Sequence, residues 1–369
     1  MQKYTHTFEN EMNDPGFLQK KTDQIRAHAA QKALKAWYLQ HARALPWREM
    51  PSLYGTWLSE IMLQQTRVET GIPKWHAFRD RFPDVHTLAL ASEEEVMKSW
   101  EGLGYYRRAR LLHKAAKAIH EAGAFPDSHA GWLALPGIGP YTAAAIASIG
   151  LGEAVAAVDG NVQRVLSRWA GIEEPVDAKP GAARVQAVAD AWLDTQNPGD
   201  HNQAVMELGA LVCAPRNPSC QTCPLSDTCH AAGDPTMWSR LPVKTPKKKP
   251  QAWDLTWHVV TCRDHVAVVQ RPETGVWATM WCFPEIPPPA NFAEVGNLCE
   301  PVTHILTHKR ITATFTLWQA PDPDALEAFA RKHGGGLVTW PEFEARARPR
   351  LLTKVWDALL RAHALGEVE

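Results

Sequence analysis

The sequence carries almost no net charge and has no long apolar run. Its 39 lysines and arginines nearly balance 40 aspartates and glutamates, giving a formal net charge of −1, so no overall positive field would draw the chain to nucleic acid. Any such binding must therefore rest on local basic clusters. No segment is apolar over the length that a membrane-spanning helix needs, and no apolar N-terminal signal segment is visible. We expect a cytoplasmic protein with no membrane partner.

Cysteine is scarce outside one cluster. The seven cysteines are an odd number without a signal segment, which argues against a disulfide framework. Four of them are separated by six, two and five residues: Cys213, Cys220, Cys223 and Cys229. Reduced thiols this close together predict a metal site. Zinc and an iron–sulfur cluster both accept four thiolates, and the spacing alone leaves both open.

Apolar residues recur at helical spacing over the first two thirds of the 369-residue chain, which is long enough for two or three domains. The spacing predicts helices over residues 22–42 and 54–68. Residues 1–22 are polar and without a stable period, so we expect a flexible lead-in there.

The pattern changes after residues 238–252, where prolines and lysines predict an extended basic linker. Alternating residues then predict strands over 255–261 and 311–317, and residues 350–364 predict a closing helix. The C-terminal third should therefore be an α+β domain.

A Pro-Gly-hydrophobe-Gly turn joins two helical segments at residues 135–139. Its glycines, Gly137 and Gly139, allow positive φ and close approach of a ligand to the backbone. Free N–H groups at the start of the following helix make a ready anion site, which suits a phosphate. Asp159 follows Gly139 by twenty residues. The alternative is a simple connection between two buried helices, with Asp159 as an N-cap.

Four motifs stand in a fixed order: SEIMLQQT at 59–66, GLGYYRRAR at 102–110, LPGIG at 135–139 and VDGN at 158–161. With the cysteine spacing, they resemble the helix-hairpin-helix DNA glycosylases of the endonuclease III superfamily, and in particular the adenine DNA glycosylase (MutY) family. The resemblance implies a multidomain protein. An all-α helix-hairpin-helix glycosylase domain with a 4Fe–4S loop would be followed by an α+β Nudix-like domain.

The resemblance also assigns catalytic roles. Glu60 would protonate the departing adenine, and Asp159 would stabilise positive charge on the sugar, with Tyr141 and Asn161 positioning the reacting groups. A bifunctional glycosylase/lyase acting on oxidised pyrimidines is one alternative, but such relatives carry lysine at position 141 and usually glutamine at position 60. A DNA-scanning module without catalysis is the other alternative, and the presence of both carboxylates argues against it.

Further contact sets follow from the resemblance. The residues expected to contact DNA are Gly137, Gly139, Gln65, Thr66, Tyr105 and Arg107. Those expected to line the base pocket are Trp47, Arg48, Leu63 and Gln203. The four clustered cysteines would hold one 4Fe–4S cluster rather than zinc. The expected substrate is double-stranded DNA with adenine opposite 8-oxoguanine or guanine, bound by a monomer that would be nucleoid-associated in a bacterium.

Residues 271–284 resemble the start of a Nudix-like domain, but the run of metal-binding glutamates that defines a Nudix hydrolase is absent after Pro284. We therefore expect an 8-oxoguanine recognition module. Leu306, Thr307 and His308 stand where the family has a Phe-Ser-His loop, with leucine replacing the aromatic ring. The expected segments are 1–22, flexible; 23–237, glycosylase with its cluster loop at 213–229; 238–252, linker; and 253–369, Nudix-like.

Overall fold

The computed structural model describes residues 15–246 and 249–360, with side chains described from residue 25 onward. Contacts divide the chain into two compact units: the residues up to Ile72 with Ala118–Pro246, and Pro73–Lys117 with the residues from the 247–248 gap onward. No helix in the described part is both long and apolar enough to cross a membrane.

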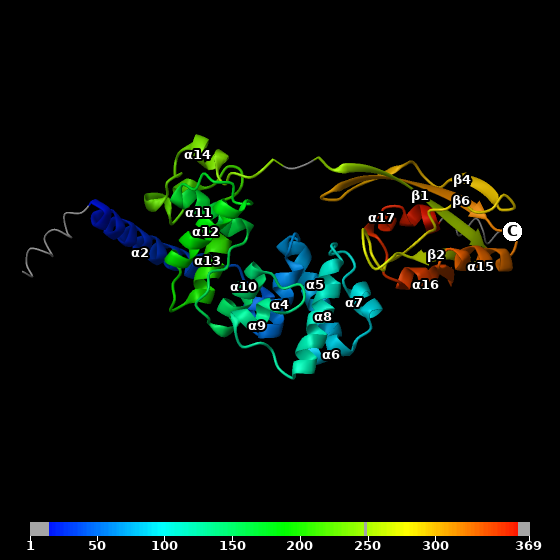
Figure 1. Ribbon diagram of the computed structural model, residues 1–369, viewed down its shortest axis with the longest axis horizontal. Coiled ribbons are helices and arrows are strands. Elements are labelled where there is room, and N and C mark those ends of the chain that lie inside the picture. Colours follow the sequence, from blue (N-terminus) through cyan, green and yellow to red (C-terminus); the bar gives the residue numbers. More distant parts are fainter. Residues whose placement is uncertain (1–14, 247–248, 361–369) are drawn as a thin grey trace, which may run out of the picture. The chain divides into compact units, whose positions relative to one another are not determined.

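The first unit is helical (Figure 1). Its elements are α2 (Pro15–His41), α3 (Pro46–Glu49), α4 (Leu53–Met62), α9 (His129–Leu133), α10 (Pro140–Leu151), α11 (Gly160–Ala170), α12 (Lys179–Trp192), α13 (Pro198–Leu211), η1 (Cys220–Thr222), η2 (Ser226–Thr228) and α14 (Pro235–Arg240).

Helix α10 is the central element of this unit, and it packs against α4, α9 and α13. Figure 1 shows it beside α4. Its residues 143–147 are alanines and one isoleucine, all buried, and small side chains let neighbouring helices approach closely. A Cβ added at Gly150 would lie 2.5 Å from Leu53 Cδ2, so a larger residue where α10 meets the start of α4 would force the Leu53 side chain to move.

A second core joins α2, α11, α12 and α13. It includes the stack of Trp169 on Trp192, with ring centroids 4.7 Å apart. The cysteine-bearing segment packs against the same core through Cys213, Cys223 and Cys229. The metal-site candidates are therefore anchored to the helices that carry Asp159 and its neighbours.

The second unit combines helices with a sheet. The helices are most of α5 (Val68–Arg81), α6 (Val85–Leu90), α7 (Glu93–Ser99), most of α8 (Arg107–Ala122), α15 (Pro323–Lys332), α16 (Trp340–Ala345) and α17 (Arg350–Thr353). The strands are β1 (Gln251–Cys262), β2 (His265–Gln270), β3 (Trp281–Cys282), β4 (Ala293–Asn297), β5 (Val302–Ile305), β6 (Lys309–Gln319) and β7 (Gly335–Thr339).

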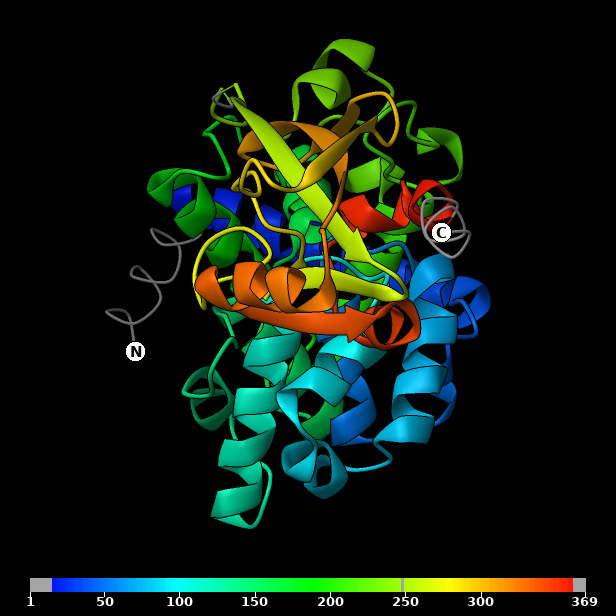
Figure 2. The same ribbon diagram turned by 90° about the vertical axis from the view of Figure 1, so that its right-hand side faces the viewer.

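The sheet is mixed, with the order β3-β2-β1-β6-β4, β5 on β6 and β7 on β2. Strands β1 and β6 run parallel, while β1 and β2 form an antiparallel hairpin. Side chains alternate between two cores: Trp257 and Val259 face one, and Val260 and Cys262 face the other with Phe329 of α15. Figure 2 shows α15 alongside β7.

The predicted strands over 255–261 and 311–317 lie within β1 and β6, as expected. The first helix differs: α2 begins at Pro15, inside the expected lead-in, and residues 1–14 lie outside the described part. The closing helix also differs, because α17 ends at Thr353 and helix resumes only over residues 356–360.

The prediction of one helix over 54–68 is wrong. Helix α4 ends at Met62, and α5 begins at Val68. Gln65 has φ +57°, a left-handed conformation that a right-handed helix cannot contain. Gln64, Gln65 and Thr66 therefore lie in a turn.

Candidate active site

Glu60 and Tyr141 meet across the α4–α10 contact. Glu60 lies in the last turn of α4, Tyr141 is the second residue of α10, and the tyrosine hydroxyl donates to Glu60 Oε2 at 2.6 Å. Burial raises the pKa of Glu60 to about 7, with a further upward contribution from the charge of Asp159, while Tyr141 and Arg48 partly oppose the shift. The carboxyl group therefore holds a proton near neutral pH.

Asp159 is the N-cap of α11, where its Oδ1 accepts from Val162 N at 2.7 Å. Asn161 Nδ2 donates to Asp159 Oδ2 at 2.9 Å. The pKa of Asp159 is raised, because the effect of burial outweighs the lowering effect of these hydrogen bonds. The capping role suggested as the plain alternative is thus present, and it also fixes the direction in which the carboxylate points.

Gly209 on α13 leaves room for the Asn161 side chain. A Cβ added at Gly209 on α13 would lie 2.7 Å from Asn161 Cβ, so only glycine lets α13 come this close to the start of α11. Arg164 Nη2 also donates to Asn161 Oδ1 at 2.8 Å. With both ends of its amide used, Asn161 is fixed against Asp159.

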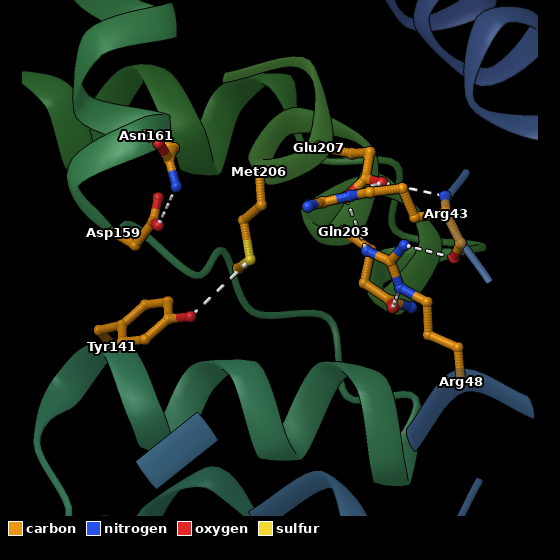
Figure 3. Close-up of polar contacts among 8 residues, drawn as sticks. All are labelled: Arg43, Arg48, Tyr141, Asp159, Asn161, Gln203, Met206 and Glu207. Carbon is orange, nitrogen blue, oxygen red and sulfur yellow. Dashed lines mark hydrogen bonds and ion pairs between the residues drawn. The ribbon is translucent and has the colours of Figure 1, made fainter. Parts of the chain in front are cut away.

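A buried ionic network holds the other side of the site (Figure 3). The Glu207 side chain is only 1% exposed, and it accepts from Arg43 Nε at 2.7 Å and from Arg48 Nη2 at 3.1 Å. Although burial alone would raise the pKa of Glu207, hydrogen bonds from the two arginines lower it to about 2. Arg48 Nε also donates to Gln203 Oε1 at 2.9 Å, so the network fixes two expected pocket residues together.

These side chains surround one open cavity of about 1580 Å³ in the first unit. All expected catalytic and base-pocket residues line it, together with two of the expected DNA contacts: Glu60, Asp159, Tyr141, Asn161, Trp47, Arg48, Leu63, Gln203, Gln65 and Thr66. Met206 also lines it, and the Tyr141 hydroxyl lies 3.8 Å from its sulfur (Figure 3). The cavity is larger than a typical small-molecule pocket and has room for a whole nucleotide.

Sequence reasoning missed Arg43, Glu207 and Met206. Glu207 follows Gln203 by four residues on α13, so the two share a helix face, and that spacing was a usable signal. The partner Arg43 lies 164 residues away along the chain, and no local pattern indicates that pair.

In the hairpin between α9 and α10, only one of the two glycines has the positive φ that the sequence pattern allows. Gly137 has φ +79°, as a glycine turn requires, but Gly139 has an ordinary φ of −92°. A Cβ added at Gly139 would meet nothing within 4 Å, and no side chain caps α10. The fold therefore does not require glycine at 139, and the start of α10 stays open to an external group.

The four clustered cysteines line a second, small cavity in the first unit. Among the described residues, no three His, Cys, Asp or Glu side chains are spaced to hold one metal ion. Burial raises the pKa of Cys223 to about 12, and neighbouring cysteines add to the shift. Arg168 Nη1 donates to Cys213 Sγ at 3.4 Å. Four thiols that line one cavity are a donor set that fits a metal centre with four thiolate ligands.

The remaining expected contacts lie in the second unit. Tyr105 is half exposed with φ +46°, and its hydroxyl lies 3.4 Å from Thr307 Oγ1. Leu306 and His308 occupy the same loop, between β5 and β6, and Arg107 is exposed at the start of α8. The structure thus brings the expected recognition loop to the expected wedge residue.

Comparison with known families defines the class of protein. A family model described as "HhH-GPD superfamily base excision DNA repair protein" matches residues 58–188, and one described as "NUDIX domain" matches residues 256–358. A solved structure of a thermostable thymine-DNA glycosylase covers 56% of this chain and 96% of its own at 24% identity, with a TM-score of 0.52, and so shares the helical fold. The chain has a helix-hairpin-helix glycosylase fold followed by a Nudix-like domain.

Sequence relatives narrow the class. An adenine DNA glycosylase of Buchnera aphidicola subsp. Schizaphis graminum is 35% identical over 260 residues, covering 69% of this chain and 74% of the relative. Those of Mus musculus and Homo sapiens are 32% and 35% identical, covering 88% and 72% of this chain and 76% and 58% of the relatives. The chain belongs to the adenine DNA glycosylase family, and it is a base-excision-repair hydrolase that acts on N-glycosyl bonds.

Proposed function

We propose that the enzyme removes adenine paired with 8-oxoguanine or guanine in duplex DNA, that it acts as a monomer, and that it leaves the strand uncut. One chain carries both carboxylates, the cavity and the hairpin with the uncapped start of α10. The observation that carries the proposal is the pair of carboxyl groups in one cavity, Glu60 with its pKa of about 7 and Asp159 with its fixed orientation.

The chemistry follows from these two environments. Adenine leaves as a neutral base once a ring nitrogen is protonated, and the neutral Glu60 carboxyl can supply that proton. Positive charge then grows on the sugar, and Asp159 stabilises it as an oriented carboxylate. Tyr141 positions Glu60, and Asn161 positions Asp159. Trp47, Leu63 and the network of Arg48 and Gln203 then enclose the extruded base, as their shared cavity supports.

Tyr141 also supports the absence of strand cleavage. A lyase needs an amine that forms an imine with the opened sugar, and a phenol cannot do so. The tyrosine hydroxyl is instead committed to Glu60 at 2.6 Å. The product should therefore be an intact strand that carries an abasic site.

The contacts with DNA divide between the two units. Gly137 and Gly139 offer the open start of α10 to a backbone phosphate, and the turn of Gln65 and Thr66 borders the cavity. In the second unit, Tyr105 would wedge into the duplex, with Arg107 on the backbone. Leu306, Thr307 and His308 would sense 8-oxoguanine. The four cysteines would hold a 4Fe–4S cluster with a structural role.

Base release and strand breakage in single-turnover assays test the proposal. The substrate is a duplex with one adenine opposite 8-oxoguanine, and a thymine-glycol duplex serves as control. We expect adenine release with strand breakage only after alkali, and at least a hundredfold loss of rate in Glu60→Gln and Asp159→Asn with DNA binding retained. A wild-type rate in either variant, or strand breakage that keeps pace with base release, would contradict the assignment.

A further inference from the structure

The first half of the predicted linker is not a free spacer. Residues 241–245, the strap, are hydrogen-bonded to the segment between α11 and α12. Val176 N donates to Val243 O at 3.0 Å. Asp177 then accepts twice from Thr245, from the backbone N at 2.9 Å and from the hydroxyl at 2.8 Å. The chain is therefore fixed on both sides of residue 244.

A buried arginine ties the start of the strap to the cysteine segment. Arg168 is 3% exposed, and its Nε donates to Leu241 O at 3.0 Å. The same guanidinium donates to Ala214 O at 2.7 Å and to Pro215 O at 3.1 Å. Leu241 itself is 2% exposed. Because one rigid, buried guanidinium bridges both segments, the strap is anchored to the core of the first unit.

Lys244 is the exposed residue between these anchors, and it lines the active-site cavity. It is the only lysine among the described residues around that cavity, and no ion pair of the described part involves it. A strand whose nucleotide enters the cavity must bring its charged backbone to the edge of the cavity, where the exposed Lys244 can contact it. Because its backbone is already anchored, Lys244 loses only side-chain entropy when it binds a phosphate.

We propose that the strap holds Lys244 as a contact for a backbone phosphate of the DNA strand that presents adenine to the cavity. The inference rests on the glycosylase activity and on the cavity, and it does not depend on the roles of Glu60 and Asp159. It assigns a defined DNA contact to one residue of a segment whose composition predicts an extended basic linker.

The salt dependence of binding tests Lys244 directly. The full-length protein is titrated with a duplex that carries a reduced abasic analogue opposite 8-oxoguanine, so that no base can be lost. Loss of one phosphate contact should lower the slope of log Kd against log salt by about 0.9, and so weaken binding about eightfold at 0.1 M salt. We expect this of Lys244→Gln, with an unchanged Tm because the side chain is exposed.

Lys249→Gln is the matched control, since it removes the same charge from the same Lys/Pro-rich segment but at a residue that does not line the cavity. It should leave the slope unchanged. An unchanged slope in Lys244→Gln, or equal changes in both variants, would overturn the proposal, because the linker would then act through diffuse charge or not at all.

Asp177→Ala tests the anchoring. Removal of a carboxylate near bound DNA would strengthen binding if only charge mattered. Release of Thr245 should instead weaken binding, by about twofold to tenfold, because Lys244 must then be ordered upon binding. The salt slope should stay near that of the wild type, since the lysine itself remains. Binding that is equal or tighter would contradict the role of the strap.

Discussion

At the scale of single residues, two glutamates that line one cavity have opposite pKa shifts. Glu60 and Glu207 line the same cavity, yet the pKa of Glu60 is raised to about 7 and that of Glu207 is lowered to about 2. Burial acts on both, but Glu207 accepts charged hydrogen bonds from two arginines, whereas Glu60 accepts one neutral bond from Tyr141. One carboxylate is thus a structural anion, and the other can hold a proton.

The raised pKa of Glu60 has a consequence for stability. Between its ordinary value of 4.5 and about 7, the folded protein binds a proton that the unfolded chain has released, so stability falls as pH rises through this window. The loss should reach about 3 kcal/mol above pH 7. Glu60→Gln cannot ionise and keeps an acceptor for Tyr141. We therefore expect the variant to have a higher Tm than the wild type at pH 8 and a similar Tm at pH 4.5, as measured by thermal unfolding.

The kinetics should show the same ionisation. The rate of adenine release should fall as pH rises through about 7, because the ionised Glu60 has no proton to donate. If the wild type and Glu60→Gln show parallel Tm profiles from pH 4.5 to 8, the carboxyl group does not titrate in this window.

The sequence indicated the residues proposed to react, but not the residues that hold them in place. Short motifs place Glu60, Tyr141 and Asp159, and the structure brings all three to one cavity. The Arg43–Glu207 pair is a tertiary contact between distant segments, so local patterns carry no trace of it. The positive φ of Gln65 ends a helix that apolar spacing alone would continue, because periodicity reports which face is buried and not where the backbone turns.

At the scale of elements, the strand positions followed from the spacing of apolar residues and the fold class followed from the family resemblance, whereas the helix ends followed from neither. Helix α10 is the element that most of the site depends on: its start forms the hairpin site, and its second residue is Tyr141. Its run of buried small residues lets α4 and α13 approach it, and these helices carry Glu60, Gln203 and Glu207. A small-residue helix has little amphipathic signal, so its central position could not be read from periodicity.

The cysteine segment leads to an element-scale prediction. We expect about four irons per chain and a brown protein, as a 4Fe–4S cluster on four cysteines requires. Cys223→Ser should lose the iron and lower the Tm, because Cys223 packs against the α2/α11/α12/α13 core beside the other cysteines. Metal analysis and thermal unfolding check this. Cys299→Ser is the control, since Cys299 lies in the second unit, outside the cluster. Stoichiometric zinc without iron would show that the cluster assignment is wrong.

At the scale of the whole molecule, contacts group the chain differently from its sequence order. Residues 73–117 precede the hairpin, yet they group with the C-terminal residues. Lys98 Nζ donates to Glu344 O at 2.6 Å, and Arg110 Nη1 donates to Ala278 O at 2.7 Å. Composition predicted a linker over 238–252, but contacts assign its first half to the first unit. Composition indicates how flexible a segment would be in isolation. It gives no information on tertiary contacts such as the hydrogen bond from Arg168 to the carbonyl of Leu241.

The strap bears on where the chain can be cut to remove the C-terminal residues. A chain that ends at Pro246 keeps the strap, whereas one that ends at Arg240 loses buried Leu241 and the bonds to Arg168 and Val176. Burial of one leucine and two hydrogen bonds together contribute about 3 kcal/mol. The shorter chain should therefore melt roughly 5 to 10 °C below the longer one.

Both truncated chains should discriminate 8-oxoguanine from guanine less well than the full chain, because both lack Thr307 and His308. Thermal unfolding and relative rates of adenine release on the two duplexes check these outcomes. Equal Tm values would mean that the strap adds nothing to the first unit, and unchanged relative rates would mean that the recognition loop lies elsewhere.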